Sequence, residues 1–139
     1  MKYKISICYP DKSKIEHRQL IDKETALSFI TNYPWRNQIK LMNSLPVEKV
    51  QYSPSVRISN VKNRHYLELT YHCENREESL FSLWYGRAKE VKLFFGFLGK
   101  IKKNKVYDKW DLNKDEAIYH FEKFLEEDYI NLEKLMIAS

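Results

Sequence analysis

The chain has 139 residues, a formal net charge of +5 and 43% hydrophobic residues, with few glycines and prolines. This length suits one domain with its own hydrophobic core, so we expect a single domain over residues 1–139, and the composition excludes a disordered or low-complexity chain. No apolar run approaches the roughly 20 residues of a transmembrane helix, and no signal peptide opens the sequence, which predicts a cytoplasmic protein.

The first third of the chain predicts strands followed by helix. Residues 3–9 alternate between apolar and polar side chains, which is typical of a strand with one buried face, and residues 15–20 predict a second strand. Asp22 then supplies an N-cap, and apolar residues follow at helical spacing until Pro34, which disfavours a helical residue before it. Residues 35–50 are ambiguous, with a short helix as one interpretation.

Three consecutive strands are predicted in the middle of the chain. Residues 55–59, 65–72 and 79–85 each alternate with a period of two, and polar connections of hairpin length join them. An antiparallel meander is the simplest assembly, and its apolar face needs a covering layer. The alternation places Trp84 with the polar set, on the same side of the meander as Tyr66.

The last third predicts a basic connection and two helices. Lysines crowd residues 100–105, which we interpret as a loop, and residues 105–110 predict a short strand. Asn113 and Glu116 have the spacing of a capping box at the start of a long amphipathic helix, and residues 130–137 predict a final short helix. The predicted fold class is therefore α+β, an antiparallel sheet of about five strands with two main helices packed on it.

The sequence holds no recognisable catalytic or metal-binding signature. The spacing of His65, His72 and Cys73 fits no standard zinc pattern, so we expect neither a metal nor a cofactor. Glu68 and His72 would project from one face of a strand, where a carboxylate could orient a histidine for acid–base catalysis. The wet face of a half-buried sheet also carries alternate polar residues, and we expect no catalytic residues and no enzymatic activity.

Trp84 is the residue that points most directly to binding. A large aromatic side chain on the outer face of a sheet is either covered by another element or offered to a partner. Trp35 and Trp110, in contrast, are expected to close the two ends of the core. We expect another protein as the partner, with aromatic anchors and basic residues in the contact: Tyr66, Trp84, Arg87, Lys100, Lys102 and Lys103.

The uneven charge leaves a second class of function open. Residues 87–110 include eight basic and two acidic residues, whereas residues 111–139 include three basic and eight acidic ones. Lysines flanked by aromatic residues suit single-stranded nucleic acid, so the alternative to a protein binder is a small nucleic-acid-binding module that uses the basic loop 100–105. A solvated mixture of charges is the simpler interpretation of the same pattern.

The order of the elements and the C-terminal pattern carry a resemblance to a known family. A meander rich in Tyr, Leu and Trp is followed by a charged turn, a short strand and a tail with defined spacing: Trp110, Leu112, Lys114, Glu116, Ala117, Phe124, Leu125 and Glu126. This outline resembles the small immunity proteins of bacterial polymorphic toxin systems, in which a first helix, here 22–31, also precedes the sheet. The resemblance implies a cytoplasmic protein without enzymatic activity that binds a cognate toxin and blocks its active site. Many such proteins are acidic, whereas this chain is basic.

Overall fold

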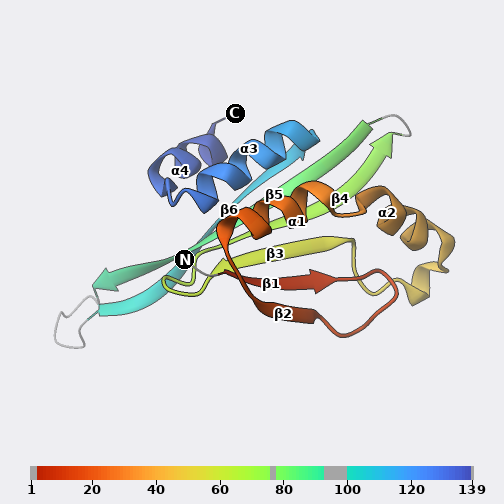
Figure 1. The fold of residues 1–139 in the computed structure, drawn as a ribbon, viewed down its shortest axis with the longest axis horizontal. Helices are drawn as coiled ribbons and strands as arrows, with labels where there is room; N and C mark the ends of the chain where they lie inside the picture. Colours follow the sequence, from red (N-terminus) through yellow and green to blue (C-terminus); the bar gives the residue numbers. More distant parts are fainter. Residues whose placement is uncertain (1–2, 76–77, 93–99, 139) are drawn as a thin grey trace.

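A computed structural model describes residues 3–75, 78–92 and 100–138, and these residues form a six-stranded antiparallel sheet with helices on one side (Figure 1). The strand order is β2-β1-β3-β4-β5-β6. The strands are β1 (Tyr3–Cys8), β2 (Glu16–Ile21), β3 (Ser55–Asn60), β4 (Tyr66–Asn75), β5 (Glu78–Lys92) and β6 (Lys100–Leu112). The helices are α1 (Lys23–Asn32), α2 (Trp35–Ser44), α3 (Lys114–Leu125) and α4 (Tyr129–Ile137), with a 3-10 turn η1 (Val47–Lys49) after α2. The predicted α+β class is confirmed, with six strands among the described residues where about five were expected.

The core lies between the helices and one face of the sheet. Fully buried side chains alternate along the four inner strands: Tyr3, Ile5, Ile7, Val56, Ile58, Leu67, Leu69, Phe81, Leu83 and Tyr85. The helices bury an apolar stripe against them: Ala26, Ile30, Phe121, Phe124 and Leu132. Burial of a large apolar side chain contributes about 1.5–3 kcal/mol, several times the difference in intrinsic helix propensity between ordinary residues. Packing on the sheet therefore holds the helices more strongly than their own propensity does.

The helix starts follow the predicted capping chemistry. Asp22 Oδ1 accepts a hydrogen bond from the backbone N–H of Thr25 at 2.8 Å, at the start of α1. Asn113 Oδ1 accepts from the N–H of Glu116 at 2.8 Å, and Glu116 Oε1 accepts in return from the N–H of Asn113 at 3.2 Å. The capping box before α3 is confirmed. These bonds satisfy backbone donors that the first turn of a helix leaves without intrahelical partners.

The ambiguous segment forms α2, which closes one end of the core. Trp35 is 4% exposed, and its ring lies 6.1 Å from that of Tyr71 and 5.2 Å from that of Phe81. The Trp35 indole N–H donates to the carbonyl of Ile30 at 3.3 Å, so its polar atom is satisfied inside the core. The expectation that Trp35 closes one end of the core is confirmed.

The basic segment 100–105 is a strand, and its interpretation as a loop was wrong. The backbone of β6 begins at Lys100 and pairs with β5 without interruption from Lys92↔Lys100 to Gly86↔Val106. Lysine and asparagine are depleted in strands, which is why the composition favoured a loop. The backbone pairing with β5, which itself continues beyond the predicted end at residue 85, decides the conformation instead.

Two buried histidines make acid stability the first test of this fold. Burial lowers the pKa of His120 below its ordinary value of about 6.5, and burial together with the charge of Arg87 lowers the pKa of His65. The unfolded chain therefore binds more protons than the folded protein as the pH falls below about 6.5, and the free energy of unfolding decreases there. We expect the melting temperature to fall by about 3 °C or more between about pH 7.5 and pH 5.5.

Replacement of each histidine by a ring that cannot be protonated provides the control. His120→Phe and His65→Phe should each show a smaller decrease of the melting temperature over the same pH range than the wild type. A decrease of equal size in the wild type and both variants would show that other groups set the acid stability.

Candidate functional site

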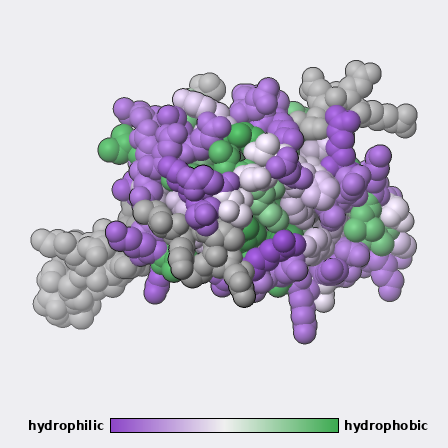
Figure 2. All heavy atoms as spheres, viewed as in Figure 1, coloured by the Kyte–Doolittle hydropathy of each residue, from purple (hydrophilic) through white to green (hydrophobic). Residues whose placement is uncertain are grey.

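The face of the sheet opposite the helices is the candidate site. Figure 1 shows the helices on the near side of the sheet, and the buried alternate side chains point toward them. The other set of side chains points away from the helices and is half-buried or exposed: Ser6, Arg57, Tyr66, Glu68, Thr70, His72, Trp84, Asp108 and Trp110. We call this surface the open face. The helix side is mostly hydrophilic in the space-filling view (Figure 2). The open face, in contrast, carries several aromatic residues.

Three rings form a cluster across β4, β5 and β6. Trp84 and Trp110 meet edge to face with their ring centroids 5.6 Å apart, and His72 lies 5.8 Å from Trp110. Trp110 is 53% exposed, and its indole N–H donates to Asp108 Oδ2 at 2.8 Å. Trp84 is half-buried because Trp110 covers part of it. We call these three residues the aromatic cluster.

A bulge in β6, just after Trp110, lets Trp110 and Leu112 lie on opposite faces of the sheet. Leu83 pairs with Lys109 and Phe81 pairs with Leu112, so β6 carries one more residue than β5 over this interval. Asp111 has a φ of 61°, a left-handed conformation that Asp tolerates better than most residues. The extra residue returns Leu112 to the core, where it is 3% exposed, and leaves Trp110 outside. The expectation that Trp110 closes an end of the core was therefore wrong.

A second group of packed side chains, centred on Tyr66, lies beside the aromatic cluster on the open face. The Tyr66 ring covers Gly86 on the neighbouring strand, at the place where a Cβ atom of residue 86 would lie. The Arg57 guanidinium lies 3.9 Å from the centroid of the Tyr66 ring, and its Nε donates to Glu68 Oε1 at 3.3 Å. These contacts fix the position of Tyr66, so that the open face carries ordered aromatic groups on three adjacent strands.

The structure brings together some of the predicted contact residues and separates others. Tyr66 and Trp84 lie on adjacent strands of the open face. Arg87 lies on the helix side instead, where its Nη1 is 3.0 Å from Glu133 Oε1 of α4. The backbones of Lys100, Lys102 and Lys103 belong to β6, whereas their side chains lie outside the described residues. Trp110 was expected to close an end of the core, just before the last long helix. In the structure it follows the alternation of β6 from Asp108 and lies on the open face, where it is 53% exposed.

The side chains considered for chemistry do not converge. His65 is 7% exposed and its ring packs 4.4 Å from Tyr129 on the helix side, whereas His72 lies on the open face. Glu68 is paired with Arg57, and no hydrogen bond joins it to His72. Among the described residues, no three His, Cys, Asp or Glu side chains gather as a metal ion would require. In the same part of the chain, every helix is too short or too polar to cross a bilayer.

Comparison of the chain with protein-family models, with curated proteins and with solved structures finds no match.

The close contact between Tyr66 and Gly86 generates a test of the open face. In Gly86→Ala the new methyl group would overlap the Tyr66 ring, and we expect a loss of about 1–3 kcal/mol in the free energy of unfolding, typical of overpacking. The same change in a Tyr66→Ser background should cost much less, because the ring is no longer there. Chemical denaturation of the four proteins of this double-mutant cycle provides the measurement, and equal costs in both backgrounds would contradict the described contact.

Proposed function

We propose that this chain is a non-enzymatic binding protein that captures another protein on the open face of its sheet. The observation that carries the proposal is the pair Trp84 and Trp110, stacked edge to face on a surface that no described helix covers. Tryptophan, tyrosine and arginine are enriched among the hot spots of protein interfaces, and the two aromatic types bury a large area at low cost in conformational entropy. Tyr66 and Arg57 extend the same kind of surface toward β3.

The polar groups around the aromatic cluster also suit a partner. His72 Nε2 is buried and has no hydrogen-bond partner within the described part of the chain, so a group of the partner could satisfy it. Asp108 and the ion pair of Arg57 with Glu68 surround the cluster with charges of both signs. A hydrophobic centre with a polar rim is the usual arrangement of a specific protein interface.

The particular role that we propose is that of an immunity protein. The resemblance of the C-terminal pattern to the immunity proteins of polymorphic toxin systems supports it, and one residue of that pattern, Trp110 of β6, belongs to the aromatic cluster. Such a protein would act in the cytoplasm and would neutralise a cognate toxin by covering its active site. It needs no chemistry of its own, which agrees with the separated positions of Glu68, His65 and His72.

The proposal predicts that the two tryptophans are binding hot spots. Protein captured from the source cell by the wild-type chain should bind Trp84→Ala and Trp110→Ala at least about 30-fold more weakly, the loss typical of a central aromatic anchor. Tyr119→Ala is the matched control, because Tyr119 is an exposed aromatic residue on α3, on the helix side. Surface plasmon resonance with the purified partner measures the affinities of the wild type and the three variants.

Two outcomes would contradict the proposal at different levels. If both tryptophan variants bind the partner as the wild type does, the open face is not the binding site. If the partner alone does not arrest the growth of a host cell, or if the chain does not restore growth, the immunity role is wrong even where the interface is right.

A nucleic-acid-binding role is the second candidate, and the register of β5 and β6 favours it. Beyond Gly86 these strands have no further sheet partner in the described register and continue as a two-stranded ribbon. Three of its cross-strand pairs bring basic residues opposite each other: Arg87↔Lys105, Lys89↔Lys103 and Lys92↔Lys100. Like charges directly opposite destabilise an antiparallel pair, and an anionic backbone alongside would relieve that repulsion.

The salt dependence of binding tests this candidate. A fluorescent single-stranded oligonucleotide should bind at low ionic strength and lose affinity by roughly tenfold or more between 50 and 200 mM salt, because phosphate contacts release counterions. The double variant Lys102→Gln/Lys103→Gln should bind more weakly and with a shallower salt dependence. No measurable change in fluorescence anisotropy at low salt removes nucleic acid as a partner.

A further inference from the structure

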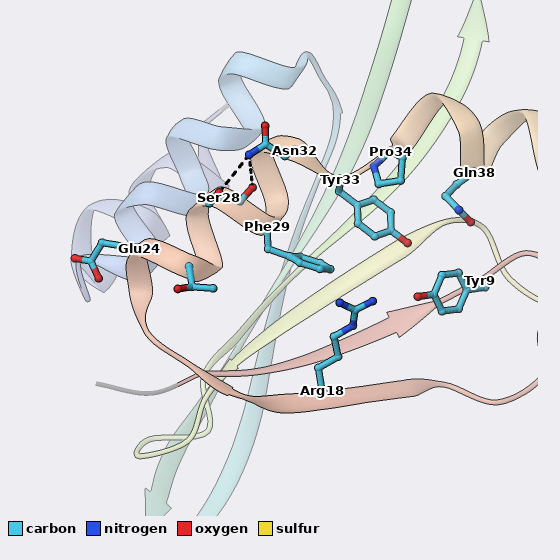
Figure 3. A pocket seen from close by; sticks show the side chains of 10 residues that line it. Tyr9, Arg18, Glu24, Ser28, Phe29, Asn32, Tyr33, Pro34 and Gln38 are labelled. Atoms are coloured by element: carbon cyan, nitrogen blue, oxygen red, sulfur yellow. Dashed lines mark hydrogen bonds between the residues drawn. The ribbon is translucent and has the colours of Figure 1, made fainter.

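A groove of about 780 Å³ lies between α1, the start of α2 and the strands β1 and β2 (Figure 3). It is on the helix side of the sheet, so it is separate from the open face. Its volume falls in the range of about 300–1,000 Å³ that small-molecule sites occupy. The residues that line it are mainly aromatic and polar, and they include Tyr9, Arg18, Glu24, Phe29, Tyr33 and Gln38.

One wall of the groove is aromatic. The rings of Phe29 and Tyr33 lie 5.5 Å apart, and Tyr33 in turn lies 4.5 Å from the buried ring of Trp35. This chain of rings anchors the wall to the core. A flat aromatic group in the groove would contact ordered ring surfaces, and ring–ring contacts favour an aromatic ligand beyond the area that it buries.

Arg18 supplies the positive charge of the groove. Its guanidinium projects from β2 to within 5.2 Å of the centroid of the Phe29 ring, and Figure 3 shows it between Phe29 and Tyr9. Its Nη2 lies 3.6 Å from Glu16 Oε2 and its guanidinium also donates to the Tyr9 hydroxyl, so a carboxylate in the groove would share the five N–H donors of the fork with both residues. Glu16 also accepts a hydrogen bond from the Tyr9 hydroxyl, which lowers the pKa of Glu16 and keeps its carboxylate ionised beside Arg18. Glu24 lies at the opposite end of the groove (Figure 3).

Two polar atoms in the groove lack partners. The Tyr33 hydroxyl oxygen and Gln38 Oε1 are both buried without a hydrogen bond among the described residues. A buried polar group left in this state destabilises the protein, and a ligand that pairs with it recovers that cost. Burial raises the pKa of Tyr33, so its hydroxyl keeps its proton and can donate. Rotation of the Gln38 amide by 180° would offer its Nε2 as a donor as well.

We propose that this groove binds a small aromatic carboxylate, with its ring against Phe29 and its carboxylate held by Arg18 and the Tyr33 hydroxyl. The Arg18 guanidinium and two neutral donors, the Tyr33 hydroxyl and the rotated Gln38 amide, match the oxygen lone pairs of a carboxylate. Charge-assisted hydrogen bonds are about twice as strong as neutral ones. The ligand is either a free small acid or the C-terminal aromatic residue of a peptide, because both offer the same ring and carboxylate. The inference does not depend on the open face, since either site can fail while the other stands.

Titration of the isotope-labelled full chain with phenylacetate, followed by NMR, tests the proposal. We expect saturable shifts confined to the amides of residues 16–18 and 28–38. Phenylacetamide, which has the same shape without the charge, should bind at least about tenfold more weakly. N-acetylphenylalanine distinguishes the two sources: tighter binding than phenylacetate indicates a peptide C-terminus, and weaker binding indicates a free acid.

Three variants connect the binding to the named residues. Arg18→Gln and Tyr33→Phe should each weaken phenylacetate binding by about tenfold, whereas Lys40→Gln removes an exposed charge elsewhere on α2 and should have no effect. Tyr33→Phe deletes a hydroxyl that has no partner, so its melting temperature should not fall, and a loss of binding is then not a loss of folding. Equal binding of phenylacetamide and phenylacetate, unchanged affinity in Arg18→Gln, or shifts scattered over α3 and α4 would overturn the proposal.

Discussion

The structure depends on one constraint, which is that the sheet is covered on a single side. Each inner strand directs alternate side chains into the core. These side chains, such as Tyr3 in β1 and Tyr85 in β5, are fully buried against α1, α3 and α4. Because a one-residue shift of register would move a whole apolar set into water, this burial fixes the pairing of the strands. The same constraint leaves the opposite set of side chains uncovered by the helices, and it therefore defines the surface on which we propose that a partner binds.

The bulge in β6 shows how a local departure from regular structure creates the site. It satisfies two demands at once, since Leu112 reaches the core while Trp110 joins Trp84 on the outside. Bulges occur more often than expected next to functional sites, where they redirect a side chain. Asp111 absorbs the left-handed conformation that this requires. The backbone of β6 thus sets the position of Trp110 in the aromatic cluster. Because the cluster and the neighbouring Tyr66 ring are already ordered, the proposed binding would need little reorganisation of them.

The sequence was sufficient for the elements whose signals are local. Alternation predicted β4 and the position of Trp84 on the outer side, and the capping box of Asn113 with Glu116 predicted the start of α3. It was insufficient where distant pairing decides. The lysines of 100–105 suggested a loop, whereas the backbone pairs with β5 there. Trp110 was expected at an end of the core, whereas it is 53% exposed on the open face. The groove was not predicted either, because Arg18, Phe29 and Gln38 belong to different elements that only the tertiary fold brings together.

The most direct test of the central claim is the accessibility of each tryptophan in the free protein. Three variants that each retain one tryptophan, with phenylalanine at the other two positions, can be quenched with acrylamide and compared by fluorescence. The account predicts the strongest quenching for Trp110, intermediate quenching for the half-buried Trp84 and the weakest for Trp35, which is 4% exposed. Quenching of Trp84 and Trp110 as weak as that of Trp35 would show that the open face is covered, and would contradict the account.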